Sequence, residues 1–278
     1  MGERACPRRW FFASLLLLFV CVQAEGPAAG GAIVAMAGDR CVALAHDRRV
    51  SSALLGGQPL IGSSARRTVL VHEGLLLGLS GLDGDVTTFA QEVVASLRLL
   101  ELEAEAAGVG GRTAAIAEER QRLRPAALAR LVSSRLYAQR VTSPYYVEPI
   151  IAGLARSRSA KPAAEPGFHE VVCGPPGDAM GTSEEEEALL LPYLCSQDSL
   201  GAPMVAKDFV CAGPCAPSLL GLCEALWEPG LSGDQLRDLA ARVLVGAMER
   251  DCLSGVGAVV YLVTPDGLTV HEIPCSSD

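Results

Sequence analysis

Residues 30–49 read GGAIVAMAGDRCVALAHDRR, and this stretch decides the fold. Two apolar runs, Ala32–Ala37 and Cys41–Ala45, flank a glycine turn, and an aspartate and two arginines follow the second run. Both runs are almost continuously apolar instead of alternating with polar residues, which predicts strands covered on both faces. The stretch therefore predicts the start of a sheet that lies between two other layers.

Helices are expected in two later parts of the chain, each time as a pair. In the first pair, Asp83 or Asp85 caps one helix and Pro125 begins the other, because apolar residues then recur three and four apart. In the second pair, one helix carries an apolar stripe from Leu219 to Trp227, and the other starts at Ser232 or Asp234. Both pairs have one apolar face, so each is expected to cover a sheet.

The order of strands and helices predicts an α+β protein with a four-layer α/β/β/α sandwich. Strands that are buried on both faces need two covers, and two stacked sheets with a helix pair outside each meet that need. The last two strands form a hairpin around the turn signal Pro265–Gly267. The expected strands are Ala32–Ala37, Cys41–Ala45, Thr68–His72, Leu75–Ser80, Glu148–Leu154, His169–Cys173, Leu191–Cys195, Asp208–Ala212, Gly257–Val263 and Gly267–Ile273.

Composition narrows the function classes. The chain has 278 residues and a formal net charge of −9, which argues against a nucleic-acid-binding protein. Its ten cysteines include no pair spaced C-x-x-C, and no histidine near Cys211 and Cys215 completes a zinc site. Several cysteines lie within apolar runs, so buried free thiols are expected. The sequence thus predicts neither a bound metal nor a cofactor.

The N-terminal residues 1–29 form a leader, and residues 30–278 form one domain. Arginines precede the apolar run WFFASLLLLFVCV at residues 10–22, and small residues follow it, as in a secretory signal peptide. An upstream extension, a propeptide and a wrongly assigned start codon are the alternatives. Within the domain, residues 155–190 are rich in Pro, Gly, Ser and charge, and they read as an inserted surface loop.

Six segments together resemble the β subunits of the proteasome, within the N-terminal-nucleophile hydrolase superfamily. The similarity runs from about Gly30 to about Ile273, with gaps near Leu55–Ser63, in the glycine-rich joint after residue 106 and in the 155–190 loop. The combination of SPYYVEPIIAGL with LCEALWEP is the most specific part of the resemblance. The segments are GGAIVAMAGDRCVALAHDRR, GLSGLDGDVTTFAQ, SPYYVEPIIAGL, LCSQDSLGAPMVAKDFVCAG, LCEALWEP and ERDCLSGVGAVVYLV.

The resemblance implies a catalytic arrangement whose key residues are replaced here. Active members attack with an N-terminal threonine whose amine acts as base, helped by a lysine that an aspartate holds. The aspartate slot falls on Asp47, and counting back from it puts Gly31 in the nucleophile slot. The lysine slot falls on Arg67, or on Ser63 if no gap is allowed, and a serine slot falls on Pro214. Glycine has no nucleophile, and arginine cannot tune its pKa as a buried lysine can.

Two residues of the implied arrangement are retained, Asp251 and Ser254. With Asp47 they are expected to act as scaffold, so no catalytic residue is predicted. Structural roles are also open: Asp47 as the ion-pair partner of an arginine such as Arg67, Asp251 as a helix-closing residue or a partner of Arg250, and Ser254 as a turn residue. The four histidines, His46, His72, His169 and His271, show no spacing typical of a nucleophile triad.

The implied function is that of a non-catalytic structural β subunit of the 20S core, which shapes a neighbour's active site in ubiquitin-dependent protein breakdown. Its partners would be other α and β subunits in stacked seven-membered rings, with assembly chaperones as a further class, in cytoplasm and nucleus. Neither nucleic acid nor a membrane is expected as a partner of the mature form. The alternative is a secreted or vesicular N-terminal-nucleophile amidohydrolase activated by leader removal.

Overall fold

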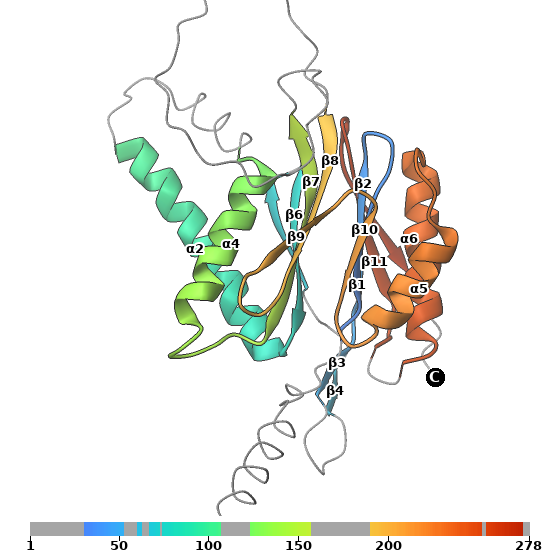
Figure 1. Ribbon diagram of the computed structural model, residues 1–278, viewed down its shortest axis with the longest axis horizontal. Helices are drawn as coiled ribbons and strands as arrows, with labels where there is room; N and C mark the ends of the chain where they lie inside the picture. The colour runs from blue at the N-terminus through green and yellow to red at the C-terminus, as the bar shows by residue number, and fades with distance from the viewer. Residues whose placement is uncertain are drawn as a thin grey trace, which may run out of the picture.

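The computed structural model describes residues 31–52, 60–62, 67–72, 74–106, 123–156, 190–251 and 254–274. Two sheets stack face to face, and a helix pair covers the outside of each (Figure 1). The expected four-layer α/β/β/α sandwich is confirmed. The leader, the glycine-rich joint and most of the 155–190 loop lie outside the described residues.

The first sheet carries the two strands that open the described chain. Its order is β10-β1-β2-β11-β12, and every neighbouring pair is antiparallel. All residues of β1 and β2 are buried, as their continuous apolar character predicted. The strands are β1 (Ile33–Ala37), β2 (Val42–Asp47), β10 (Phe209–Ala212), β11 (Ala258–Thr264) and β12 (Gly267–Ile273).

The second sheet has the order β5-β6-β7-β8-β9, again with antiparallel neighbours. A separate two-stranded ribbon, β3 (Val50–Ser52) with β4 (Leu60–Gly62), follows β2. The strands of the second sheet are β5 (Thr68–His72), β6 (Leu75–Gly81), β7 (Val147–Arg156), β8 (Leu190–Gln197) and β9 (Pro203–Ala206).

Helices α2 (Asp83–Ala106) and α4 (Pro125–Gln139) cover the second sheet, and α5 (Ala216–Leu226) and α6 (Gly233–Met248) cover the first (Figure 1). Proline begins α4, and Ser232 and Gln235 form a capping box at the start of α6. Three apolar clusters fill the interfaces between the four layers, so the core is divided in the same way as the layers.

Most expected elements lie where the sequence placed them, and the last hairpin turns at Pro265 and Asp266. Strands β3, β4 and β9 were not expected. Strand β5 was expected to be covered on both faces, and this was wrong: it is an edge strand, and the Leu70 side chain is 52% exposed. The expected strand at 169–173 lies outside the described residues.

Five cysteines fall among the described residues, and all five are free thiols, as expected for them: Cys41, Cys195, Cys211, Cys215 and Cys223. None of the helices within the described ranges has both the length and the apolar character that a membrane span requires.

Candidate functional site

Gly31 lies just before β1, where the first sheet meets the second. Its φ of +141° is a backbone conformation that residues with a side chain rarely adopt. The Ser80 hydroxyl on β6 donates a hydrogen bond of 3.1 Å to the Gly31 carbonyl. Gly213, with φ +97°, lies so close that a Cβ there would overlap the same carbonyl oxygen. The two glycines therefore allow a close backbone approach at this end of the sandwich.

Asp47, at the end of β2, is fully buried and connects three parts of the chain. Its Oδ1 accepts a hydrogen bond of 3.1 Å from the Ala32 N–H, and its Oδ2 accepts one of 3.1 Å from the Gly255 N–H. The Arg67 Nε lies 3.1 Å from Oδ1, so the predicted ion pair is confirmed. Burial raises the pKa of Asp47 to about 6, and Arg67 and the two N–H donors act against this rise without cancelling it.

Arg67, just before β5, is 2% exposed. Its Nη2 donates a hydrogen bond of 2.6 Å to the Arg49 carbonyl. A Cβ built on Gly31 would overlap the Cζ and Nη1 atoms of Arg67. The guanidinium group therefore occupies the space in which a side chain at residue 31 would begin.

Asp251 and Ser254 lie where the chain leaves α6 for β11. The Ser254 hydroxyl donates a hydrogen bond of 2.6 Å to the Asp251 Oδ2, and the Ser254 carbonyl accepts one of 3.3 Å from the Arg49 Nη1. The Asp251 N–H bonds to the Met248 carbonyl, so Asp251 also closes α6. Arg49 bonds to Ser254, and Asp47 bonds to both Gly255 and Ala32. Asp251 and Ser254 therefore lie at the same end of the molecule as Gly31.

Pro214 is exposed and lies next to Gly213, between β10 and α5. The following residue, Cys215, is buried, and burial raises the pKa of its thiol to about 11, to which the charges of Asp251 and Asp47 contribute. A thiol with so high a pKa is protonated at neutral pH and is a poor nucleophile.

His46 precedes Asp47 on β2 and is 3% exposed. Its Nδ1 is 2.6 Å from the Asp47 carbonyl, and its ring stacks on Tyr261 with centroids 5.8 Å apart. Burial lowers the pKa of His46 to about 4, and the charges of Arg67 and Arg48 lower it further. The imidazole is therefore neutral at pH 7, and it packs against Tyr261 in the interface between the two sheets.

The structure thus brings Gly31, Asp47, Arg67, Asp251 and Ser254 to one end of the sandwich, together with Pro214 beside Gly213. It adds Ser80 and Glu148, to which the sequence analysis gave no role. The Glu148 Oε2 accepts a hydrogen bond of 3.0 Å from the Gly213 N–H. Both residues lie in segments that carry the resemblance, Ser80 in GLSGLDGDVTTFAQ and Glu148 in SPYYVEPIIAGL. Their contacts left no signal in the sequence, because each contact joins distant parts of the chain.

The chemistry available at this end is limited. Gly31 offers no nucleophile, the Ser80 hydroxyl is bonded to a backbone carbonyl, and the Ser254 hydroxyl is bonded to Asp251. Among the described residues, no cluster of three or more His, Cys, Asp or Glu side chains could hold a metal ion.

Comparison with known proteins gives consistent matches. The pattern of the family described as Proteasome subunit matches residues 28–161 and 188–263. A Trypanosoma brucei brucei protein named proteasome subunit beta type-3 is 34% identical over 249 residues, which cover 90% of this chain and 97% of that protein. The proteins of the same name from Picea mariana and Drosophila melanogaster are 33% and 30% identical, over 85% and 90% of this chain and 91% and 97% of their own lengths.

Proposed function

This chain belongs to the proteasome subunit family, and we propose that it is a structural β subunit of the 20S core particle without a catalytic site of its own. It takes part in the breakdown of ubiquitin-marked proteins by building the inner chamber and by shaping the active site of a neighbouring subunit. The named relatives are all β type-3 subunits, and the match covers nearly their whole length.

The observation that carries the non-catalytic role is the position of Arg67. Its guanidinium group is held by the Asp47 carboxylate and the Arg49 carbonyl and fills the space beside Gly31. In a catalytic subunit this space belongs to the nucleophile and to the amine that activates it. Here Gly31 and Arg67 leave neither a reactive group nor room for one, and Asp47, Asp251 and Ser254 serve as scaffold.

The partners follow from family membership. A proteasome subunit assembles with other proteasome subunits, and we propose stacked seven-membered rings of α and β subunits, with assembly chaperones as transient partners. A ring of different subunits needs heterologous interfaces, one for each neighbour. No cofactor is part of this role.

Cytoplasm and nucleus are the proposed compartments. The five free thiols among the described residues fit a reducing environment. The signal-like residues 1–29 remain in conflict with this location and lie outside the described residues. The domain is proposed to run from residue 30 to residue 278, with an insertion at about 155–190.

Affinity purification of the tagged chain, followed by mass spectrometry, tests the assembly. We expect other α and β subunits in amounts equal to the tagged chain, and their absence would overturn the proposal. A covalent threonine-directed inhibitor added to the purified particle should label other β subunits and leave this chain unmodified.

The alternative function, a secreted amidohydrolase, is not favoured by the comparisons. One measurement distinguishes it from the structural subunit. Intact-mass analysis of the mature chain would reveal its first residue. A mature N-terminal Ser, Thr or Cys, together with labelling of this chain by the inhibitor, would reinstate the enzyme.

A further inference from the structure

Two thiols of the chain lie in contact with each other, one on β10 and the other on α5. The Sγ atoms of Cys211 and Cys223 are 3.9 Å apart, and either thiol can donate a hydrogen bond to the other. Both are free in the structure. A pair of adjacent thiols has a chemistry that neither thiol has alone, because one sulfur can complete a reaction that begins at the other.

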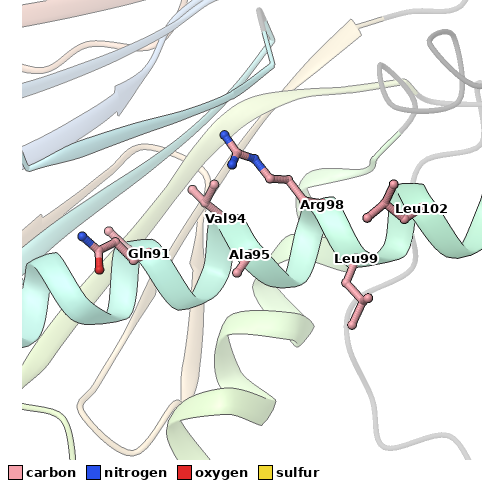
Figure 2. A pocket seen from close by; sticks show the side chains of 7 residues that line it. Gln91, Val94, Ala95, Arg98, Leu99 and Leu102 are labelled. Atoms are coloured by element: carbon pink, nitrogen blue, oxygen red, sulfur yellow. The ribbon is translucent and has the colours of Figure 1, made fainter.

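The groove on the outer face of α2 offers no comparable reactive group. Its volume is about 530 Å³, and all of its lining residues come from α2, so no opposite wall encloses a ligand. Figure 2 shows its side chains, which are apolar apart from the amide of Gln91 and the guanidinium group of Arg98. Neither of these two groups is a nucleophile at neutral pH. The groove therefore lacks the chemistry that the thiol pair supplies.

The fold itself brings the two cysteines together, because β10 lies beneath α5 (Figure 1). Successive side chains of a strand point to opposite faces. Val210 and Ala212 pack between the two sheets, so Cys211 faces the helix layer. On α5, Leu219 and Cys223 are the buried residues, four positions apart on one face. Both thiols therefore belong to the apolar cluster between the first sheet and its helices.

The separation of the two sulfur atoms suits a disulfide bond. The bond has a length of about 2.05 Å, so atoms that are already in contact need to approach by only about 2 Å. The bond would join residues 12 positions apart and would tie β10 to α5. Cys215, the third thiol of this region, caps the start of α5. It lies two helical turns before Cys223, a rise of about 12 Å, which is too far for a bond between them.

The two thiols differ in their access to solvent. Cys211 is partly exposed, whereas Cys223 is 0% exposed. An oxidant therefore reaches Cys211 first, and Cys223 is in place to react with the oxidised sulfur. The hydrogen bond with Cys223, followed by burial, raises the pKa of Cys211, so little thiolate is present at neutral pH and the first step is slow. The pair therefore stays reduced until the exposure to an oxidant is sustained.

We propose that Cys211 and Cys223 are an oxidative modification site, at which a hydroperoxide forms a reversible disulfide bond. The Cys211 thiolate attacks hydrogen peroxide, the O–O bond breaks, and a sulfenic acid forms on Cys211. The hydroxide that leaves takes up the proton that Cys211 had lost. The Cys223 sulfur then attacks the Cys211 sulfur, the S–O bond breaks, and a second water leaves with the Cys223 proton. Two thiols are oxidised, and one peroxide is reduced to two waters.

This site goes beyond the proposed function, because its chemistry needs neither a catalytic centre nor a particular neighbouring subunit. While the disulfide is present, the Cys211 sulfur is protected from further oxidation to sulfinic and sulfonic acids, which are not readily reversed.

The test uses the full tagged chain, purified with the proteins that accompany it and treated with hydrogen peroxide. Free thiols are blocked with N-ethylmaleimide, and the unreduced chain is digested with chymotrypsin, which cleaves after the leucines between the two cysteines. We expect mass spectrometry to find two peptides joined through Cys211 and Cys223, and at least tenfold less of this product after treatment with dithiothreitol. Cys211 joined instead to Cys215 or to glutathione, or oxidised to the sulfonic acid without a disulfide, would overturn the inference.

Two variants identify the partner of Cys211. Cys223→Ala removes the second thiol, and the same peroxide treatment should then give several-fold more sulfinic and sulfonic acid on Cys211 than in the wild type. Cys215→Ala is the matched control and should form the disulfide to the same extent as the wild type. Equal irreversible oxidation of Cys211 in the wild type and in Cys223→Ala would contradict the proposal. The wild-type measurement decides the matter alone if a variant is not recovered, and neither readout depends on which subunits accompany the chain.

Discussion

The Gly31 end of the sandwich and the outer face of α2 differ in which interactions are already made within the chain. At the Gly31 end, two buried charged groups, Asp47 and Arg67, are paired with each other and with backbone groups. On α2, apolar side chains such as Leu99 and Leu102 are more than half exposed, and Arg98 has no ion pair within the described residues.

This difference separates an end of the sandwich whose polar groups are already paired from a helix face whose side chains are exposed. Catalysis needs a polar group that is free to react and space for a substrate, and the Gly31 end has used its groups for structure. Association needs exposed apolar area with a few unpaired charges, and the α2 face has kept both. The paired groups at the Gly31 end therefore contribute to the stability of the chain, whereas the exposed side chains of α2 contribute little to it.

The largest expected effect comes from breaking the buried pair. Asp47→Asn leaves the Arg67 charge buried without a counter-charge, and we expect it to lower the free energy of unfolding by about 3–5 kcal/mol. Urea unfolding of the refolded chain, followed by circular dichroism, measures this. Removing both charges with Asp47→Asn and Arg67→Met should restore much of the loss, because burial itself disfavours the charged Asp47.

An exposed pair provides the control for this experiment. Arg48 and Glu272 form an ion pair of 3.3 Å with side chains that are 40% and 71% exposed. Glu272→Gln should change the free energy of unfolding by less than about 1 kcal/mol. A comparable loss for Asp47→Asn and Glu272→Gln would show that the Gly31 end is not held by its buried charges.

The next effect concerns pH and His46. Its pKa is lowered from 6.5 to about 4 in the folded chain, so the unfolded chain binds the proton more readily. The stability due to neutral His46 is therefore complete above pH 6.5 and is lost as pH falls toward 4. A shift of this size corresponds to about 3 kcal/mol.

A comparison of the wild type with His46→Gln isolates this contribution. The raised pKa of Asp47 works in the opposite direction between about pH 6 and 4, but it is common to both proteins. Between pH 6.5 and 4, the wild type should lose about 3 kcal/mol more than His46→Gln, measured by urea unfolding at each pH. Parallel pH profiles would mean that His46 is not held neutral between the sheets.

The strands of the sandwich interior could be predicted because their own residues determine their environment. Strand β1 and the first four residues of β2 are apolar, and both strands are buried along their whole length. Strand β5 also has an apolar run in its middle, yet it lies at an edge, where Leu70 is exposed and Val69 and Val71 pack inward. Position in a sheet depends on pairing with distant segments, and no local pattern records it. The short strands β3, β4 and β9 were missed for the same reason.

The site shows the same limit. The ion pair of Asp47 with Arg67 was foreseen, since a buried carboxylate near an arginine needs a partner. The hydrogen bonds from Ser80 to Gly31 and from Gly213 to Glu148 join residues 49 and 65 positions apart. That the Arg67 guanidinium fills the side-chain space of residue 31 depends on both sheets at once, so only the three-dimensional structure reveals it.

A smaller effect is expected from adding a side chain at Gly31. Gly31→Ala needs a backbone conformation at φ +141° that alanine disfavours, and its Cβ would displace Arg67. We expect a loss of about 1–3 kcal/mol in urea unfolding. In combination with Arg67→Met the two losses should be less than additive, by about 0.5–3 kcal/mol, since the overlapping atoms are then gone. Strict additivity would indicate that Arg67 does not fill this space.

The smallest effect on the chain itself is expected on the α2 face, and it completes the comparison. Leu99→Ser removes an apolar side chain that is already 54% exposed, so the free energy of unfolding of the refolded chain should change by less than about 0.5 kcal/mol. Leu77→Ala, at a fully buried leucine of β6 below the same helix layer, should cost about 2–5 kcal/mol. If Leu99→Ser destabilises the refolded chain as much as Leu77→Ala does, the α2 face belongs to the core of this domain and is not an open surface for another subunit. If instead it leaves the chain stable, this face contributes nothing to the core of the domain and its apolar side chains are available for contacts outside the chain.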